Sequence, residues 1–346
     1  QRGTSLTIAH DGVLDAFLVD RFHMGMGANF ETLDGAYSQA SDGPDGGLFN
    51  SILWTTGTAE AAIASDELFY MKHVIEAQNC QRVALGTSAS KQVTLSFYVK
   101  SSITGTYGAN IYKPDAAGDL AASIVTGTYA ISSANTWERK TITFPSGTAA
   151  ALGITYDNGV GLHITWHLAA GSSYTATDGT SWGDYATGKW AYGHAQNGVI
   201  TTAGATWGIT GVQVEVGPVA TEFEQEDFGT TLGKCQRYYQ KWGDGEGDNL
   251  APLGAGFWHG VSLVLGNLNF KHPMRAAPTI NESSADFATV YVQNSTVSSN
   301  DTAPCDLIGT TEARLILTPA SNGTAGEGTH IHIRASGEYL EADAEL

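Results

Sequence analysis

The sequence predicts an all-β protein. A jelly-roll-like β-sandwich is expected over residues 1–224, a short linking helix within 225–250, and a second, smaller β-sandwich over 251–346. Apolar residues recur at every second position in several short segments, which is the pattern of strands with one buried face. Turn residues separate these segments, and the chain has 42 glycines but only 15% charged residues. A length of 346 residues suits two domains rather than one core.

The first domain is predicted from alternating segments along residues 1–224. The apolar faces comprise Val93, Leu95, Phe97 and Val99; Ile142 and Phe144; Leu162, Ile164, Trp166 and Leu168; and Val212, Val214 and Val216. Gly217 and Pro218 end the last of these strands, because proline has no N–H to donate to a ladder. Short strands joined by turns, without helix-length patterns between them, favour antiparallel pairing in a sandwich.

The linker shows a different period. Apolar and aromatic residues recur every three to four positions at Leu232, Cys235, Tyr238 or Tyr239, and Trp242. This spacing predicts a short helix between Asp227 and Trp242. Gly233 inside it costs about 1 kcal/mol relative to alanine, so packing must hold the helix in place. The glycine-rich segment 243–249 is expected to end the helix as a loop.

The second domain is again predicted from strand patterns. Six strand candidates are 257–265, 268–271, 289–293, 313–317, 329–334 and 339–344. In one of them Ile331 and Ile333 alternate with His330 and His332, which places the two histidines on the same face. These segments predict the smaller sandwich.

Landmark segments fall in a recognisable order along the whole chain. Among them are ITGVQVEVGPVATEFE at 209–224, CQRYY at 235–239, PMRAAPT at 273–279 and DAEL at 343–346. In these segments the chain resembles a group of bacteriophage and prophage virion proteins, the tail fibres and minor structural proteins. The resemblance does not extend to residues 169–206 and 281–328, where function is expected to vary.

The resemblance implies a location and partners. Proteins of this group assemble as homo-oligomers, most often homotrimers, in the virion, and are made in the cytoplasm of the bacterial host. Residues 1–5 (QRGTS) look like the middle of a first strand, so we expect a missing N-terminal segment that joins other virion proteins. The expected role is a tail-fibre or receptor-binding subunit that attaches to a bacterial surface glycan. A capsid head fibre or decoration protein is the alternative within the group.

Charge, hydropathy and cysteine content disfavour several kinds of partner and site. The formal net charge is 17 − 35 = −18, and Lys and Arg are scattered, so nucleic-acid binding is disfavoured. The sequence contains no run of about 18 apolar residues, so insertion of a helix into a membrane is not predicted. Cys80, Cys235 and Cys305 are widely spaced and odd in number, which argues against a disulfide framework and a thiolate zinc site. No cofactor is predicted.

Aromatic residues between 169 and 206 suggest a carbohydrate-binding loop. Trp182, Tyr185, Trp190 and Tyr192, together with Tyr174, are interleaved with Gly, Ser, Thr, Asp and Lys. Sugar C–H faces stack on such rings while neighbouring polar groups hold the hydroxyls. The alternative is that the rings cap the sandwich core or fill a subunit interface.

Metal sites are less clearly indicated. His330 and His332 would lie within about 7 Å of each other, and three copies around a threefold axis could supply six ligands; otherwise the pair simply faces solvent. His163 and His167 are about 13 Å apart at about 3.3 Å per residue, too far to share one ion. The segment 244–249 resembles the start of a calcium loop. The twelfth position, where an EF-hand has a bidentate Glu, is Ala255, and this excludes an EF-hand.

Enzymatic motifs are absent from the sequence. It contains no Gly-x-Ser-x-Gly, no phosphate-binding loop and no His-Glu-x-x-His pattern. A non-enzymatic protein is therefore predicted. A virion-associated polysaccharide depolymerase is the alternative, because two of the numerous acidic residues could meet in space. A bacterial carbohydrate-binding module separated from its enzyme would fit the fold but explains the CQRYY and DAEL segments poorly.

Overall fold

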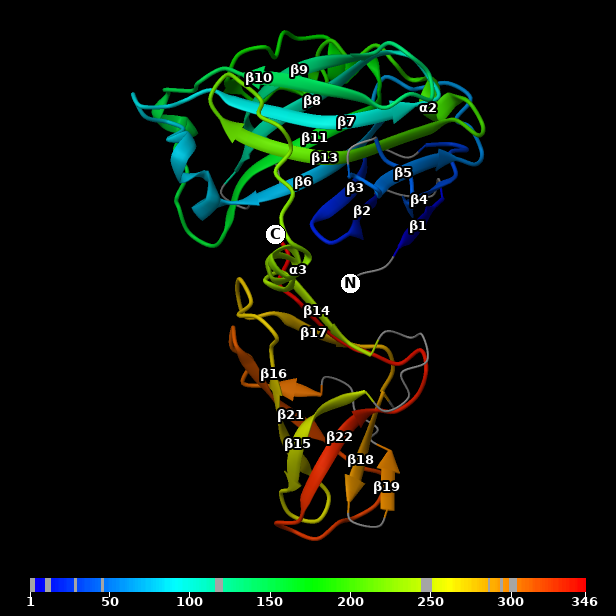
Figure 1. The fold of residues 1–346 in the computed structure, drawn as a ribbon, viewed down its shortest axis with the longest axis vertical. Coiled ribbons are helices and arrows are strands. Elements are labelled where there is room, and N and C mark those ends of the chain that lie inside the picture. The colour runs from blue at the N-terminus through cyan, green and yellow to red at the C-terminus, as the bar shows by residue number, and fades with distance from the viewer. Residues whose placement is uncertain are drawn as a thin grey trace. The chain divides into compact units, whose positions relative to one another are not determined.

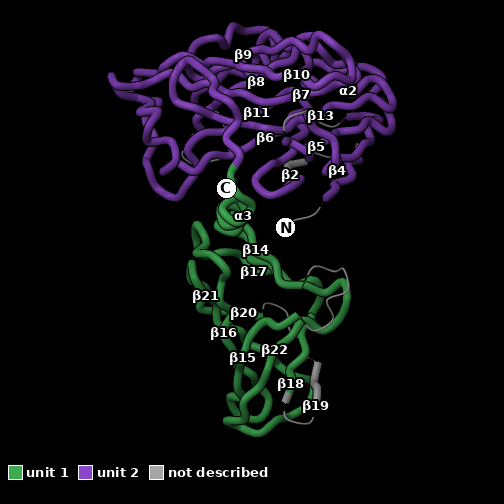
Figure 2. The backbone as a smooth tube through the Cα atoms, viewed as in Figure 1, with its two compact units in different colours: residues 1–2, 226–345 green, residues 3–225, 346 purple. Residues whose placement is uncertain are grey.

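The computed structural model describes residues 4–9, 14–27, 30–44, 47–115, 121–243, 251–285, 287–292, 295–298 and 304–346. Within them the chain is all-β, with antiparallel sheets (Figure 1). It forms two compact units, the N-terminal unit of residues 3–225 and the C-terminal unit of residues 226–345 (Figure 2). The division falls beside residue 224, and the described part of the expected linker, from residue 226 onward, belongs to the C-terminal unit.

The N-terminal unit is a sandwich of two antiparallel sheets. The first sheet has the order β1 (Ser5–Ile8), β4 (Gly35–Ala40), β5 (Ser51–Thr56), β13 (Thr206–Val216), β7 (Val93–Ser101) and β10 (Glu138–Phe144). The second has the order β12 (Gly183–Asp184), β9 (Ala121–Ile131), β8 (Gly105–Pro114), β11 (Val160–Ala170), β6 (Leu68–Glu76), β3 (Phe22–Gly27) and β2 (Leu14–Val19). Short helical turns connect them: η1 (Ala77–Val83), η2 (Ala150–Leu152), η3 (Thr187–Lys189), α1 (Ser172–Thr175) and α2 (Gly198–Thr201).

The core of this unit lies between its two sheets. The predicted apolar faces of β7 and β11 are confirmed, since Leu95, Phe97, Ile164 and Trp166 are fully buried. Val212, Val214 and Val216 of β13 pack against the same core and are only partly buried. The alternation thus places one face of each sheet inward and leaves the other face available for other contacts.

The C-terminal unit is a smaller sandwich that begins with a helix, α3 (Phe228–Gln236). One sheet has the order β14 (Tyr239–Trp242), β23 (Leu340–Asp343) and β17 (Thr279–Glu282). The larger sheet has the order β19 (Ser295–Ser298), β18 (Ala288–Val292), β22 (Gly328–Ile333), β15 (Pro252–Trp258), β16 (Val264–Asn269), β21 (Glu312–Leu317) and β20 (Cys305–Asp306). Their core contains Trp258, Val264, Leu315 and Ile331.

Three expected elements differ from the structure, and one of them is the separate strand predicted over 268–271, because residues 268 and 269 are instead the end of β16. The helix predicted from Asp227 to Trp242 ends at Gln236, because Tyr239–Trp242 form β14 and pair with Leu340–Asp343 of β23. Asp227 caps its start by accepting a hydrogen bond from the Thr230 N–H at 3.0 Å. The strand predicted over 257–265 is instead a hairpin: β15 ends at Trp258, and Gly260 adopts a positive φ of 84° in the turn before β16.

Candidate functional site

Part of residues 171–205, the insert that connects β11 to β13, contacts the face of the second sheet that points away from the core of the N-terminal unit. Several hydrogen bonds hold this insert there. Asn110 of β8 donates from Nδ2 to the Trp190 carbonyl at 2.7 Å. On β9, the Thr126 hydroxyl donates to the Lys189 carbonyl at 2.6 Å and its N–H to the Gly179 carbonyl at 2.7 Å. The insert is therefore a fixed covering over β8 and β9.

The structure brings Trp190 and Tyr185 together but gives their rings different environments. Trp190 is 8% exposed and packs on Tyr112 and Tyr70, with ring centroids 5.0 and 6.0 Å away. Tyr185 is 39% exposed and meets Trp190 edge to face at 5.8 Å. Trp190 thus supports Tyr185 from beneath, and Tyr185 presents its ring to solvent.

The other two predicted rings lie partly inside the unit. Trp182 packs against the core between the sheets and donates from Nε1 to the Pro145 carbonyl at 2.9 Å. Tyr192 is half-buried. In this structure Trp182 and Trp190 therefore have packing roles, while a glycan contact by Tyr185 or Tyr192 stays a prediction.

A buried polar group lies under the insert. Asn110 also donates from Nδ2 to His167 Nε2 at 3.2 Å, and the Thr165 hydroxyl donates to Asn110 Oδ1 at 2.7 Å. His194 Nδ1 accepts from the Gly108 N–H at 3.0 Å. Burial lowers the pKa of His194 to about 4 and holds that of His167 well below 6.5. These neutral histidines fasten the insert to the sheet.

The remaining histidine predictions can be placed on their strands. His163 and His167 are both buried on β11, and His163 stacks on Tyr112 with ring centroids 4.3 Å apart. His330 and His332 lie on β22 with ring centroids 6.3 Å apart. Within the ranges that the structure describes, no group of three or more His, Cys, Asp or Glu residues is placed to hold a metal ion. The candidate calcium loop, 244–249, lies outside the described residues.

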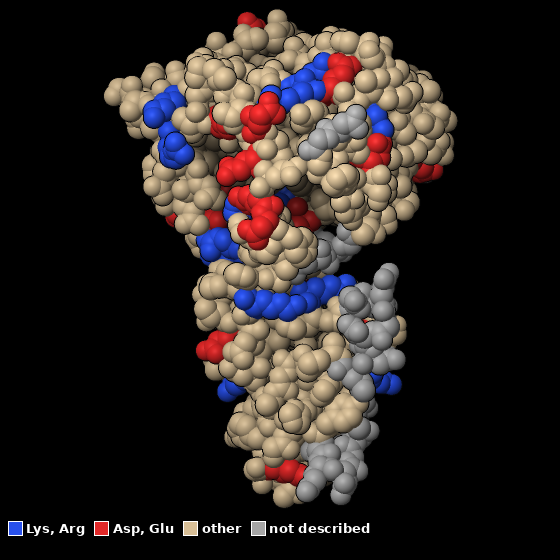
Figure 3. Space-filling model, in the orientation of Figure 1, with Lys and Arg blue, Asp and Glu red and all other residues tan. Residues whose placement is uncertain are grey.

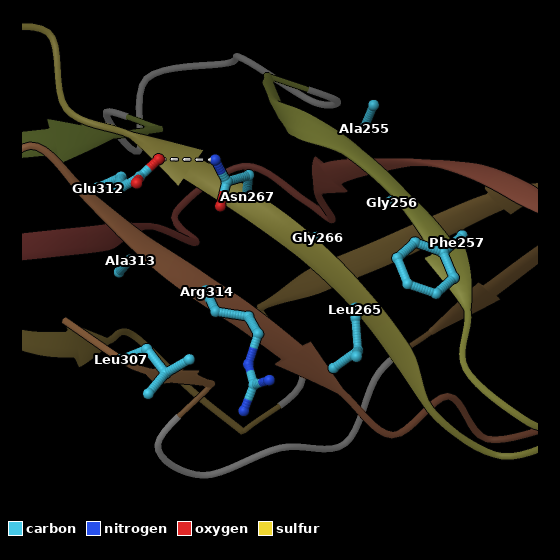
Figure 4. A pocket seen from close by; sticks show the side chains of 10 residues that line it. All are labelled: Ala255, Gly256, Phe257, Leu265, Gly266, Asn267, Leu307, Glu312, Ala313 and Arg314. Atoms are coloured by element: carbon cyan, nitrogen blue, oxygen red, sulfur yellow. Dashed lines mark hydrogen bonds between the residues drawn. The ribbon is translucent and has the colours of Figure 1, made fainter.

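Sequence reasoning missed an open hollow of about 530 Å³ in the C-terminal unit. It lies on the face of the larger sheet that points away from the core, over β15, β16 and β21 (Figure 4). Its lining consists of Ala255, Gly256, Phe257, Leu265, Gly266, Asn267, Leu307, Glu312, Ala313 and Arg314. Volumes of about 300 to 1,000 Å³ are usual for small-molecule sites.

One side of the hollow is apolar and unusually exposed. Phe257 is 46% exposed and Leu307 is 73% exposed, while Leu265 beside Phe257 is half-buried. Figure 4 shows the Phe257 ring beside Leu265, with Leu307 near Arg314. Exposed Phe257 directly precedes fully buried Trp258, and this break in apolar alternation is the one signal in the sequence that could have indicated an outward-facing ring.

The other side of the hollow carries polar groups in fixed positions. Asn267 donates from Nδ2 to Glu312 Oε2 at 2.9 Å. Arg314 donates from Nε to Asp306 Oδ1 at 2.7 Å and from Nη2 to Oδ2, an arrangement that lowers the pKa of the Asp306 carboxyl. These hydrogen bonds orient the side chains of Asn267, Glu312 and Arg314. Their remaining donors and acceptors therefore have defined positions for a ligand.

This lining differs from the groups that hydrolases normally use. Among the lining residues Glu312 is the one carboxylate, whereas hydrolysis of a glycosidic bond normally uses two. The nearby Asp306 has a lowered pKa because Arg314 hydrogen-bonds to it, so it is held as a carboxylate and is poorly suited to donate a proton. The lining holds no serine, cysteine or histidine that could act as a nucleophile.

On the face drawn in Figure 3, the described Lys and Arg side chains form small groups separated by acidic and uncharged surface. Among the helices formed by the described residues, none combines the length and apolar character needed to cross a bilayer.

No protein-family model and no curated protein matches the chain. Solved structures with detectable similarity include carbohydrate-binding modules and discoidin II. The family 11 carbohydrate-binding module of the cellulosomal cellulase Lic26A-Cel5E of Clostridium thermocellum is 11% identical over 63% of this chain and 96% of its own, with a TM-score of 0.31. The CBM22-1 xylan-binding domain from Paenibacillus barcinonensis Xyn10C is 10% identical over 53% and 82%, with a TM-score of 0.23. Wild-type discoidin II from Dictyostelium discoideum is 10% identical over 88% and 86%, with a TM-score of 0.18. Similarity at this level assigns no ligand to the chain.

Proposed function

We propose that this protein is a non-enzymatic glycan-binding protein and that the hollow of its C-terminal unit holds the sugar. The observation that carries the proposal is that one hollow is lined both by the exposed Phe257 ring and by the planar polar groups of Asn267, Glu312 and Arg314. A sugar ring has an apolar C–H face and a rim of hydroxyls, so it needs this combination on one surface.

The energy available at this site is modest. Covering about 50 to 100 Å² of the apolar surface of Phe257 and Leu265 would contribute about 1 to 2.5 kcal/mol, at about 25 cal/mol per Å². Hydrogen bonds to the oriented polar groups would add a similar amount, because the protein side is already arranged. A single hollow is therefore a weak site.

The charges around the hollow favour an uncharged ligand. Arg314 contributes +1, while Asp306 and Glu312 contribute −1 each, so these three groups sum to −1. The whole chain carries −18. A sugar carboxylate would be repelled by this balance, and Arg314 is already committed to Asp306. Neutral hexoses or N-acetylated amino sugars fit the site better than uronates.

The biological setting of the proposal comes from the sequence resemblance. We propose a tail-fibre or receptor-binding subunit of a bacteriophage virion, assembled as a homotrimer in the host cytoplasm. Three weak sites linked in one particle would act together through their high effective concentration. A head fibre or decoration protein would use the same surface. Electron microscopy of virions labelled with an antibody against this chain distinguishes the two locations.

Glycan-array binding by the full chain tests the function. Phe257→Ala is expected to lower the signal of bound neutral glycans by about tenfold or more, which corresponds to about 1.4 kcal/mol. Phe49→Ala is the matched control, because Phe49 is 76% exposed and lies in the other unit. Equal binding by both variants and the unmodified protein, or no binding to any glycan, would refute the proposal.

The enzymatic alternative has its own assay. Incubation of the protein with the bound polysaccharide should release no new reducing ends. Release of sugar that Glu312→Gln abolishes would assign a depolymerase to this hollow instead.

A further inference from the structure

Outward-facing residues of the larger sheet line up from strand to strand beyond the hollow. Arg314 of β21 pairs with Asp306 of β20 on one side and with Asn267 of β16 on the other. Gly256 pairs with Gly266, which places Ala255 of β15 beside Asn267. This line of residues alternates with the buried positions of the same strands, so its side chains share the outer face.

The same line continues past β15 on the far side. Ala255 pairs with His330 of β22, and His330 pairs with Tyr291 of β18. His330 is exposed and Tyr291 is half-buried. The ring of His332 lies 4.8 Å from that of Tyr291 and 6.3 Å from that of His330, so the three rings form one group.

An apolar line runs parallel to the first. Phe257 of β15 pairs with Leu265 of β16, and Leu265 pairs with Ile316 of β21. Together the two lines cross six strands, from β20 to β18. Five steps of about 4.8 Å between strands make this surface about 24 Å long.

We infer that this surface, the cross-strand track, binds a linear oligosaccharide of several neutral sugar units, with the hollow at one end and His330 and Tyr291 at the other. The inference rests on the proposed function. A single sugar placed on Phe257 would cover only part of the track, and the exposed His330 and the half-buried Tyr291 offer a ring face and hydrogen-bonding groups to later units.

The cross-strand track also gives His330 a role that requires no metal. A single chain presents two imidazoles here, and the described residues supply no third ligand. Direct contact with sugar hydroxyls needs only one exposed imidazole per unit. Binding through the track is therefore expected to persist in EDTA.

Calorimetry with oligosaccharides of increasing length tests the inference. The probes are gluco-, manno- and galacto-oligosaccharides of two, four and six units, titrated in EDTA. The unmodified chain is expected to bind the hexasaccharide of at least one series about tenfold more tightly than its disaccharide. His330→Ala should remove this gain while leaving disaccharide affinity within about twofold. His272→Ala is the control, because His272 is an exposed histidine that lies outside the cross-strand track.

The outcomes separate the two proposals. Equal affinity for short and long oligosaccharides, or a length gain that survives in His330→Ala, would overturn the cross-strand track and leave the hollow as a sugar site. Binding that is seen without EDTA and lost in its presence would indicate a metal-dependent site and also overturn it. If none of the three series binds, the track is overturned, and the array result with Phe257→Ala decides whether the hollow binds glycans at all.

Discussion

The buried His194 makes the stability of the N-terminal unit depend on pH. Its Nδ1 accepts from the Gly108 N–H at 3.0 Å and its Nε2 faces Asn197 Oδ1 at 3.3 Å, so the neutral ring with its proton on Nε2 satisfies both neighbours. Burial lowers its pKa from 6.5 to about 4. An unfolded chain would take up a proton near pH 6.5, whereas the folded chain would not do so until about pH 4.

The sign and size of the effect follow from this difference. The stabilising contribution is present above about pH 6.5 and is lost as the pH falls toward 4, because the unfolded state then binds more protons. Between pH 7 and pH 5 the loss from His194 is about 2 kcal/mol. His167 acts in the same direction, since burial also lowers its pKa.

Comparison with a non-titrating variant isolates this contribution. In His194→Asn the side-chain amide can still accept from the Gly108 N–H. Urea unfolding of both proteins, followed by tryptophan fluorescence, gives the free energy of unfolding at each pH. The advantage of the unmodified protein over the variant should shrink by about 2 kcal/mol from pH 7 to pH 5. An advantage that is the same at both pH values would refute the assignment of His194 as a buried neutral group.

Three further predictions concern named side chains. Trp190→Ala should lower the free energy of unfolding of the N-terminal unit by about 3 to 5 kcal/mol, whereas Tyr185→Ala should change it by less than about 1 kcal/mol; equal effects in urea unfolding would contradict the buried and exposed roles of the two rings. Gly266→Ala should destabilise the C-terminal unit by about 1 to 3 kcal/mol in thermal unfolding, because its Cβ would lie 2.6 Å from Ile331 Cδ1, and an unchanged transition would show that Ile331 can move aside. Glu312→Gln removes one negative charge from the hollow and should raise array signals of uronate-containing glycans relative to neutral ones; an unchanged ratio would show that charge does not set the preference.

The fold could be predicted to a large extent because burial acts on every second side chain of a strand. Phe97 and Ile164 are fully buried where the alternation placed them. The same reliance on alternation led to a single strand being predicted over 257–265, where the structure has a hairpin. Val261 continues the apolar pattern through the turn although it is 56% exposed, and the pattern contains no other sign of the turn than Gly260.

The site could be predicted much less well, because its geometry depends on pairing between distant strands. Composition identified Trp190 as a ring in a polar loop, but its burial comes from Tyr70 and Tyr112 on two other strands. The hollow needs Phe257 and Arg314 on one face, and that follows only from the registers of β15, β16 and β21. Local sequence specifies which side chains point outward but not which of them meet.

A glycan site in the hollow needs Phe257 to be exposed, whereas an interface of the expected homotrimer could bury it. The outward-facing line of exposed Phe257 and half-buried Leu265 and Ile316 is also the kind of surface that a subunit interface buries. If it is a sugar site, Phe257→Ala should lose glycan binding and keep the mass of the assembly in light scattering. If it is an interface, Phe257→Ala should dissociate the assembly. The assembled unmodified protein would then bind no glycan at the hollow. Measuring both properties on one variant therefore decides which surface this is.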